Sequence, residues 1–140
     1  MSRHIEIGAD GRAITIESDE TPDFCIALYQ NAAPVAISGA GAVSVDCYYT
    51  AATSTSTDAW TLADGAIHGQ MKKVQMIVDG GTSTLTLASA ASASLDVITY
   101  ADAGDFALLM WTDQDDDGAG YWRILELGND ADGATGPSVG

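Results

Sequence analysis

The stretch FALLMWTDQDDDGAGYWRILEL, residues 106–127, decides the fold class of this chain. Its two ends, 106–111 and 121–127, are mostly apolar runs, and the acidic, glycine-containing segment 113–120 lies between them. Because Asp-Gly tolerates the positive φ angles of tight turns, we expect a β-hairpin here. Neither run alternates cleanly between apolar and polar residues, so we expect both strands to be buried on both faces, at the centre of a sheet.

Short runs of the same kind recur along the chain, rich in β-branched and aromatic residues and separated by turn residues. The best helical candidate is 82–95, but Thr84–Leu87 alternates with a period of two, which is typical of a strand. We therefore predict an all-β fold, a small antiparallel β-sandwich or barrel-like domain. The expected strands are 5–7, 13–17, 24–29, 35–38, 43–50, 60–62, 71–78, 85–87, 96–100, 106–112 and 121–127. Asp-Gly occurs five times, at 10–11, 64–65, 79–80, 117–118 and 132–133.

The length of 140 residues supports one domain. We expect an N-terminal extended arm over 1–22, a β-domain over 23–128 and a flexible acidic tail over 129–140. The segment 50–58, which is rich in Ser, Thr and Ala, is expected to be a polar loop.

The charge balance excludes several classes of partner. Five Lys and Arg against 20 Asp and Glu give a net charge of −15. A nucleic acid or an anionic membrane needs a basic surface, so we expect neither as a partner. Copies of such a chain repel one another, and self-association therefore requires apolar contact or a cation. The candidate residues for apolar contact are Met71, Val74, Met76 and Ile77.

The N-terminal ten residues lack the apolar core of a signal peptide, and no apolar run approaches the length of about 18 residues that a membrane span needs. We therefore expect synthesis in a cytoplasm. Cys25 and Cys47 form no Cys-x-x-Cys motif and are interpreted as small buried thiols, with a disulfide between them as the alternative.

The inventory of reactive residues predicts no enzyme and no catalytic residues. The only histidines are His4 and His68, of which His68 is interpreted as a turn residue, and no Ser occupies a Gly-x-Ser-x-Gly elbow. The segment 39–44 begins like a dinucleotide-binding loop, but Ser44 replaces its third glycine and a β-like run follows instead of a helix. It is interpreted as a turn, and no cofactor is expected.

The segment 113–118, Asp-Gln-Asp-Asp-Asp-Gly, matches the first half of a calcium-binding loop. The closing Glu of such a loop belongs at its twelfth position, which here is Ile124, and Glu126 comes two residues later. An acidic hairpin tip is the favoured interpretation. The alternative is a calcium or magnesium site with Asp113, Asp115 and Asp117 as ligands.

The three tryptophans, Trp60, Trp111 and Trp122, allow two interpretations. A row of exposed indoles would be a platform for sugars. Two of the three lie in the most apolar strands, however, so packing in the core is favoured.

Four elements of the second half occur in an order that resembles a β-domain found in structural proteins of tailed bacteriophages. They are the Gly-Gln-x-Lys strand at 69–72, the Thr-Leu-Thr strand at 84–86, the Asp-x-Gly-Asp turn at 102–105 with its apolar strand, and the Trp-containing closing strand that ends at Gly128. The resemblance covers about residues 58–128. It implies an all-β virion component, often a symmetric trimer, with no catalytic residues to transfer.

The function expected from this resemblance is that of a capsid decoration (cement) protein on the virion surface. Its partners would be the major capsid protein and two further copies of itself, as a homotrimer, and strands of the N-terminal arm could pair with the edge of a capsid sheet. The first alternative is a tail, fibre, adaptor or head-spike subunit of the virion. The second is a secreted calcium- or carbohydrate-binding β-module.

Overall fold

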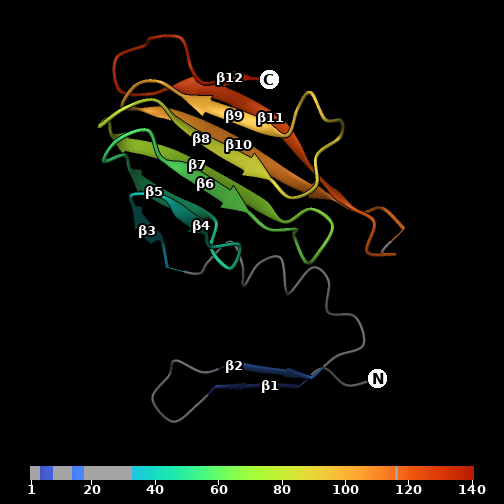
Figure 1. Ribbon diagram of the computed structural model, residues 1–140. Coiled ribbons are helices and arrows are strands. Elements are labelled where there is room, and N and C mark those ends of the chain that lie inside the picture. Colours follow the sequence, from blue (N-terminus) through green and yellow to red (C-terminus); the bar gives the residue numbers. More distant parts are fainter. Residues whose placement is uncertain (1–3, 8–13, 18–32, 116) are drawn as a thin grey trace.

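The computed structural model describes residues 4–7, 14–17, 33–115 and 117–140, and this part of the chain contains strands and no helix. Ten strands form two five-stranded sheets that pack face to face (Figure 1). In spatial order, the first sheet contains β11 (Tyr121–Asn129), β10 (Asp105–Thr112), β7 (Met71–Val78), β5 (Tyr49–Thr53) and β3 (Val35–Ser38). The second contains β12 (Ser138–Val139), β9 (Val97–Tyr100), β8 (Ser83–Leu87), β6 (Ala59–Leu62) and β4 (Gly41–Val43). The predicted all-β sandwich is confirmed.

The first six strands of the sandwich follow a flattened coil. The chain alternates between the sheets, so that β3, β5 and β7 lie in the first sheet and β4, β6 and β8 in the second. Each pass adds one strand to each sheet, parallel to the strand before it. The remaining pairs, β7 with β10, β10 with β11, β8 with β9 and β9 with β12, are antiparallel. The prediction of an antiparallel sandwich is therefore correct for the second half of the fold and wrong for the coil.

The core between the sheets is built from alternate residues of the inner strands. Trp60 and Tyr100 meet edge to face with ring centroids 5.5 Å apart, and Trp111 and Trp122 do the same at 5.4 Å. The three tryptophans are at most 2% exposed, which confirms that they belong to the core. The indole N–H groups of two of them are also satisfied: Trp60 donates to the carbonyl of Gly39 and Trp122 to that of Ala63.

Two expectations about individual strands need correction. The strand β10 is an interior strand of the first sheet, but its outward side chains are half-buried, so the expected burial on both faces is wrong. The strand β11 is the edge strand of this sheet, and its Leu125 is 45% exposed at a register shift opposite Leu108 and Leu109. The single strand expected over 43–50 is divided between β4 and β5, because the chain passes from one sheet to the other through the irregular segment 44–48.

The C-terminal residues belong to the sandwich. The strand β12 pairs with β9, Pro137 is buried, and Val139 packs against the core. The boundary predicted at residue 128 is therefore wrong, since 129–140 returns to the second sheet.

In the predicted arm, β1 (His4–Ile7) and β2 (Ile14–Glu17) form an antiparallel hairpin, as the strands expected at 5–7 and 13–17 suggested. The strand expected at 24–29, together with Cys25, lies outside the described residues. No helix in the described residues has the length and apolar character to cross a membrane.

Candidate functional site

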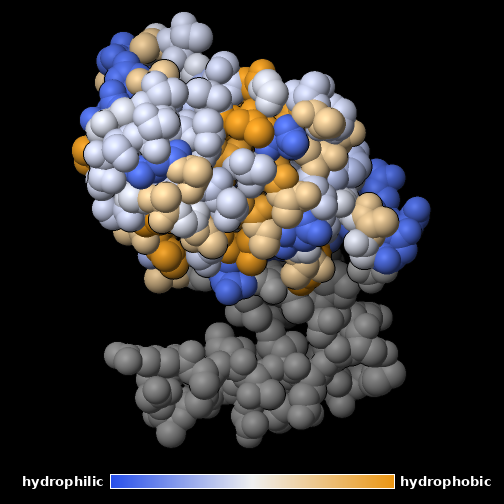
Figure 2. All heavy atoms as spheres, in the orientation of Figure 1, coloured by the Kyte–Doolittle hydropathy of each residue, from blue (hydrophilic) through white to orange (hydrophobic). Residues whose placement is uncertain are grey.

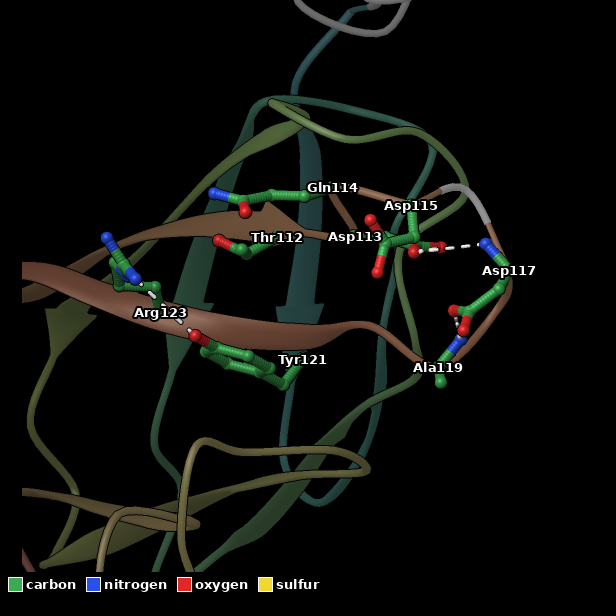
Figure 3. A pocket seen from close by; sticks show the side chains of 8 residues that line it. All are labelled: Thr112, Asp113, Gln114, Asp115, Asp117, Ala119, Tyr121 and Arg123. Carbon is green, nitrogen blue, oxygen red and sulfur yellow. Dashed lines mark hydrogen bonds between the residues drawn. The ribbon is translucent and has the colours of Figure 1, made fainter.

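The loop between β10 and β11 holds the predicted metal ligands, and Figure 3 shows it from close by. The carboxylate of Asp113 accepts hydrogen bonds from the backbone N–H groups of Asp117 at 3.3 Å and Gly118 at 3.1 Å. Asp117 in turn accepts one from Ala119 at 2.9 Å. Both carboxylates therefore fold the loop back on itself, and Gly118, with φ of 81°, supplies the left-handed turn. The predicted hairpin is confirmed.

A pocket of about 300 Å³ lies beside this loop (Figure 3). Its lining comprises Thr112, Asp113, Gln114, Asp115, Asp117, Ala119, Tyr121 and Arg123. Within the described part of the chain, no three His, Cys, Asp or Glu side chains are grouped so that they could hold a metal ion. The described residues thus do not bring Asp113, Asp115 and Asp117 together as a ligand set.

His68 lies in the turn before β7, as its interpretation as a turn residue suggested. Its Nδ1 accepts a hydrogen bond from the backbone N–H of Asp113 at 3.0 Å. The two loops at this end of the sandwich are therefore linked by a structural contact.

The outward side of the first sheet combines apolar and cationic side chains. Alternate residues of β5, β7 and β10 point away from the core there and are half-buried, and exposed residues of β11 lie beside them. We call this surface the outer face; its members are Tyr49, Ala51, Met71, Lys73, Gln75, Phe106, Leu108, Met110, Arg123 and Glu126.

Both cationic side chains on the described surface belong to the outer face. Lys72, Lys73 and Arg123 are the only Lys and Arg in the described residues, and Lys72 is buried. The Nζ atom of Lys73 lies 4.4 Å from the centroid of the Phe106 ring and 3.6 Å from a carboxylate oxygen of Asp130. Lys73 thus covers an aromatic ring while it stays close to solvent.

Acidic residues are nearly absent from the strands of the two sheets. Asp105 and Glu126 are the only acids in the ten strands of the two sheets, and Asp105 is buried. Hydrophilic side chains gather at the two ends of the visible surface, where the loops after β10 and β11 lie, whereas apolar and weakly polar residues fill most of its middle (Figure 2). Within residues 33–115 and 117–140, the negative charge is therefore concentrated in the loops.

The predicted apolar contact residues divide between two sides of β7. Val74 and Met76 are fully buried, so their prediction as surface residues is wrong. Met71 lies on the outer face and Ile77 is 47% exposed at the end of the strand. A period of two separates the pairs, because successive side chains of a strand point to opposite sides of the sheet.

A buried polar cluster lies on the inner side of the same strand. The Nζ atom of Lys72 donates to the carbonyl oxygen of Cys47 at 3.0 Å, to Thr50 Oγ1 at 2.7 Å and to Cys47 Sγ at 3.3 Å. Lys72 and Thr50 are fully buried and Cys47 is 2% exposed. This cluster was not predicted from the sequence, although Lys72 has the same parity along the strand as the core residues Val74 and Met76.

Comparison of the chain with protein-family models, curated proteins and solved structures found no match.

Two features of the described residues thus have chemical consequences. The outer face offers apolar side chains and two cations to another surface, and the buried cluster places a thiol against an amine. In the acidic loop, by contrast, the carboxylates of Asp113 and Asp117 accept hydrogen bonds from backbone N–H groups of the same loop.

Proposed function

We propose that this chain is a non-enzymatic virion structural protein, a capsid decoration protein that binds the outside of a phage head and stabilises it as a homotrimer. The observation that supports this most directly is the outer face of the first sheet. It combines half-buried apolar side chains with Lys73 and Arg123, on a molecule whose net charge is −15. Together with the resemblance of residues 58–128 to phage structural β-domains, it favours a protein that works through contact surfaces.

The occupant that fits the outer face best is another copy of the same chain. Copies repel one another wherever their acidic loops approach, and the outer face carries few of those acids. Met71, Leu108 and Met110 supply apolar area, and Arg123 and Glu126 supply opposite charges within one surface. Contact through this face buries apolar atoms and keeps the loops of neighbouring copies apart.

The contact with the shell is assigned to the N-terminal arm. Its hairpin of β1 and β2 has strand edges that could extend a sheet of the major capsid protein. A trimer carries three such arms, so weak individual contacts add up to firm attachment through avidity. Deletion of Met1–Thr21 should therefore release the protein from heads, and full retention of head binding would remove the arm from this proposal.

Mass spectrometry of purified particles, with heads separated from tails, tests the proposal as a whole. We expect the chain in the head fraction, at a copy number that matches three per three-fold position of the shell. Its presence in tails alone would transfer the function to a tail subunit. Absence from both fractions would overturn a virion role.

A substitution on the outer face tests the trimer. Met110→Asp places a charge on the half-buried apolar surface, and we expect a monomer with a lower melting temperature, because the trimer contact stabilises the parent, and weaker retention on heads. Thr61→Asp is the matched control, since Thr61 is an exposed strand residue on the outer side of the second sheet. A Met110→Asp protein that remains trimeric in sedimentation experiments would exclude the outer face as the trimer contact.

A tail or fibre subunit is the second candidate, and one observation favours it. The coil begins with β3 and β4, and each of them is the edge strand of its own sheet. The two edges lie at the same end of the sandwich (Figure 1). Parallel coils of this kind build elongated structures when further coils are added at an open end. Recovery of the chain in the tail fraction would support this candidate.

A further inference from the structure

Lys72 is a fully buried lysine whose three hydrogen-bond partners include no carboxylate. It donates to a carbonyl oxygen and a hydroxyl oxygen, and its third contact is the sulfur atom of Cys47 at 3.3 Å. An ammonium group has three protons, so these contacts use all of them. Nζ and Sγ are therefore held in direct contact, with no room for water between them.

The surroundings favour the reactive form of each group in turn: the thiolate while Lys72 is charged, and the neutral amine once the thiolate has reacted. Burial lowers the pKa of Lys72, although the Cys47 sulfur opposes this effect, and a larger share of neutral amine results. Burial raises the pKa of Cys47, but the charge of Lys72 and the hydrogen bonds from Thr50 and Lys72 outweigh it and leave the pKa below its ordinary value. The thiolate is the form that reacts with peroxides, and the neutral amine is the nucleophilic form of lysine.

We propose that oxidation of Cys47 by hydrogen peroxide joins it covalently to Lys72 through a sulfur–nitrogen bond. In the first step the Cys47 thiolate attacks one peroxide oxygen, an S–O bond forms, the O–O bond breaks, and hydroxide leaves as water with a proton from the Lys72 ammonium, which becomes a neutral amine. In the second step the Nζ lone pair attacks the sulfur, an S–N bond forms, the S–O bond breaks, and hydroxide leaves as water with an amine proton. One peroxide is consumed, two waters are released, and the product is a sulfenamide, the analogue of the known condensation of a sulfenic acid with a backbone nitrogen.

The position of Cys47 makes the first step feasible. It lies in the irregular segment 44–48 between β4 and β5, next to the exposed Asp46. A small oxidant can therefore reach the sulfur after a local shift of this segment, with no strand pair to break. The amine is already in contact, so it captures the sulfenic acid before a second peroxide does.

The cross-link would tie segment 44–48 to β7 and close the chain between residues 47 and 72. In the chain-entropy account of cross-links, a loop of this length raises the melting temperature by about 10 °C. The cluster would then act as an oxidant-dependent staple inside the sandwich. This inference does not depend on the proposed virion function.

The test uses the full chain with Cys25→Ser, because a Cys25–Cys47 disulfide would cause the same mass change. After treatment with hydrogen peroxide, we expect an intact mass lower by about 2 Da, that is, by two hydrogen atoms. Chymotryptic digestion, which cuts between the two residues after Tyr48, Tyr49 and Trp60, should give two peptides joined through Cys47 and Lys72. Trypsin should fail to cleave after Lys72, and dithiothreitol should restore the separate chymotryptic peptides. The melting temperature should rise with the extent of cross-linking.

Two lysine variants in the Cys25→Ser background provide the comparison. Lys72→Met should lose the cross-link and collect oxygen on Cys47, whereas Lys73→Met should retain it, because Lys73 points to the outer face. Should Lys72→Met not fold, the peptide map of the Cys25→Ser protein decides alone. Oxygen addition at Cys47 without the joined peptide would overturn the proposal, as would a joined peptide about 14 Da heavier than its parts, which would mean an oxygen bridge in place of the S–N bond.

Discussion

Asp58 holds the turn between β5 and β6 together through one carboxylate. It accepts hydrogen bonds from the backbone N–H of Thr55 at 2.7 Å and of Ser56 at 3.4 Å, and from both of their hydroxyl groups. The bond from the Thr55 N–H is the main cause that keeps the pKa of Asp58 below its ordinary value, against an opposing effect of burial. The end of the segment 50–58, expected to be a polar loop, is thus an organised turn, and its beginning belongs to β5.

This contact makes stability depend on pH in the acidic range. Because the folded chain holds the Asp58 proton less tightly than the unfolded chain, its stabilisation is complete above the ordinary pKa of an aspartate and is lost as the pH falls through the lower, folded value. Asp58→Asn should flatten the acid limb of a plot of unfolding free energy against pH, measured with urea. The exposed Asp64, changed to Asn, is the control. An acid limb unchanged by Asp58→Asn would rule out this role.

Trp122 is 1% exposed and packs edge to face against Trp111. Trp122→Ala should reduce the free energy of unfolding by about 3–5 kcal/mol, because it removes a large core side chain and leaves a cavity. Leu125→Ala, on the exposed part of the same strand, should cost less than about 1 kcal/mol. Equal losses for the two variants, measured by urea unfolding, would contradict the placement of Trp122 in the core.

At the scale of elements, the sequence located most strands but not the way they pair. The apolar and β-branched runs at 35–38 and 71–78 match β3 and β7 residue for residue. Asp117-Gly118 forms a hairpin turn, as Asp-Gly does most often, but Asp64-Gly65 and Asp79-Gly80 connect strands of different sheets. The same dipeptide serves both connections, so sequence alone favoured antiparallel neighbours throughout.

The glycines of the coil explain why the sequence does not distinguish a hairpin turn from a connection between the two sheets. A Cβ atom on Gly80 would lie 2.3 Å from the carbonyl oxygen of Ser54, and one on Gly65 would lie 2.4 Å from Cγ of Trp111. At these two positions glycine is required because segments distant in the chain pack closely against it, and neither glycine has a positive φ. Such a requirement depends on the final fold and leaves no local signal.

For the candidate sites too, the sequence indicated which residues to consider but not how the fold arranges them. Alternate residues of a strand point to opposite sides of the sheet, so Met71 and Lys73 share one side and Lys72 and Val74 the other. The sequence shows this grouping but does not show which of the two groups faces the core. A lysine between apolar residues is usually exposed, which is why Lys72 was missed. The half-match to a calcium loop predicts Asp113, Asp115 and Asp117 as ligands, and in the described residues these side chains are not grouped as a metal site. Asp113 and Asp117 accept hydrogen bonds from backbone N–H groups of the loop, which the sequence does not specify.

The last strand contributes to stability although it is short. Truncation before Pro137 removes the pairing of β12 with β9, the buried proline and the contact of Val139 with the core. We expect a loss of about 2 kcal/mol in urea unfolding. Ser138→Ala, an exposed change in the same strand, should have no measurable effect. A truncated chain as stable as the parent would show that the second sheet is complete without β12.

At the scale of the whole molecule, the separation of acidic loops from nearly neutral sheets predicts how salt affects assembly. Raising the salt concentration from about 0.1 M to about 1 M shortens the Debye length from about 10 Å to about 3 Å, which screens the repulsion between the loops of neighbouring copies. Self-association should therefore strengthen with salt in sedimentation equilibrium experiments. Weaker association at high salt would indicate instead that ion pairs of Lys73 and Arg123 dominate the contact.

The coil of β3 to β8 also determines how the chain can reach its native state. In that part of the molecule, strands that pair within a sheet are always separated along the chain by a strand of the other sheet. The hairpin of β10 and β11 can close locally, but every pair of the coil has to wait for a longer loop to close. The chain should consequently fold in milliseconds to seconds. Each strand of the coil can pair only after its neighbour in the same sheet has taken its place. While the coil forms, the edges of its parallel strands are unpaired. If many copies are synthesised together, these edges would be exposed to one another during that time.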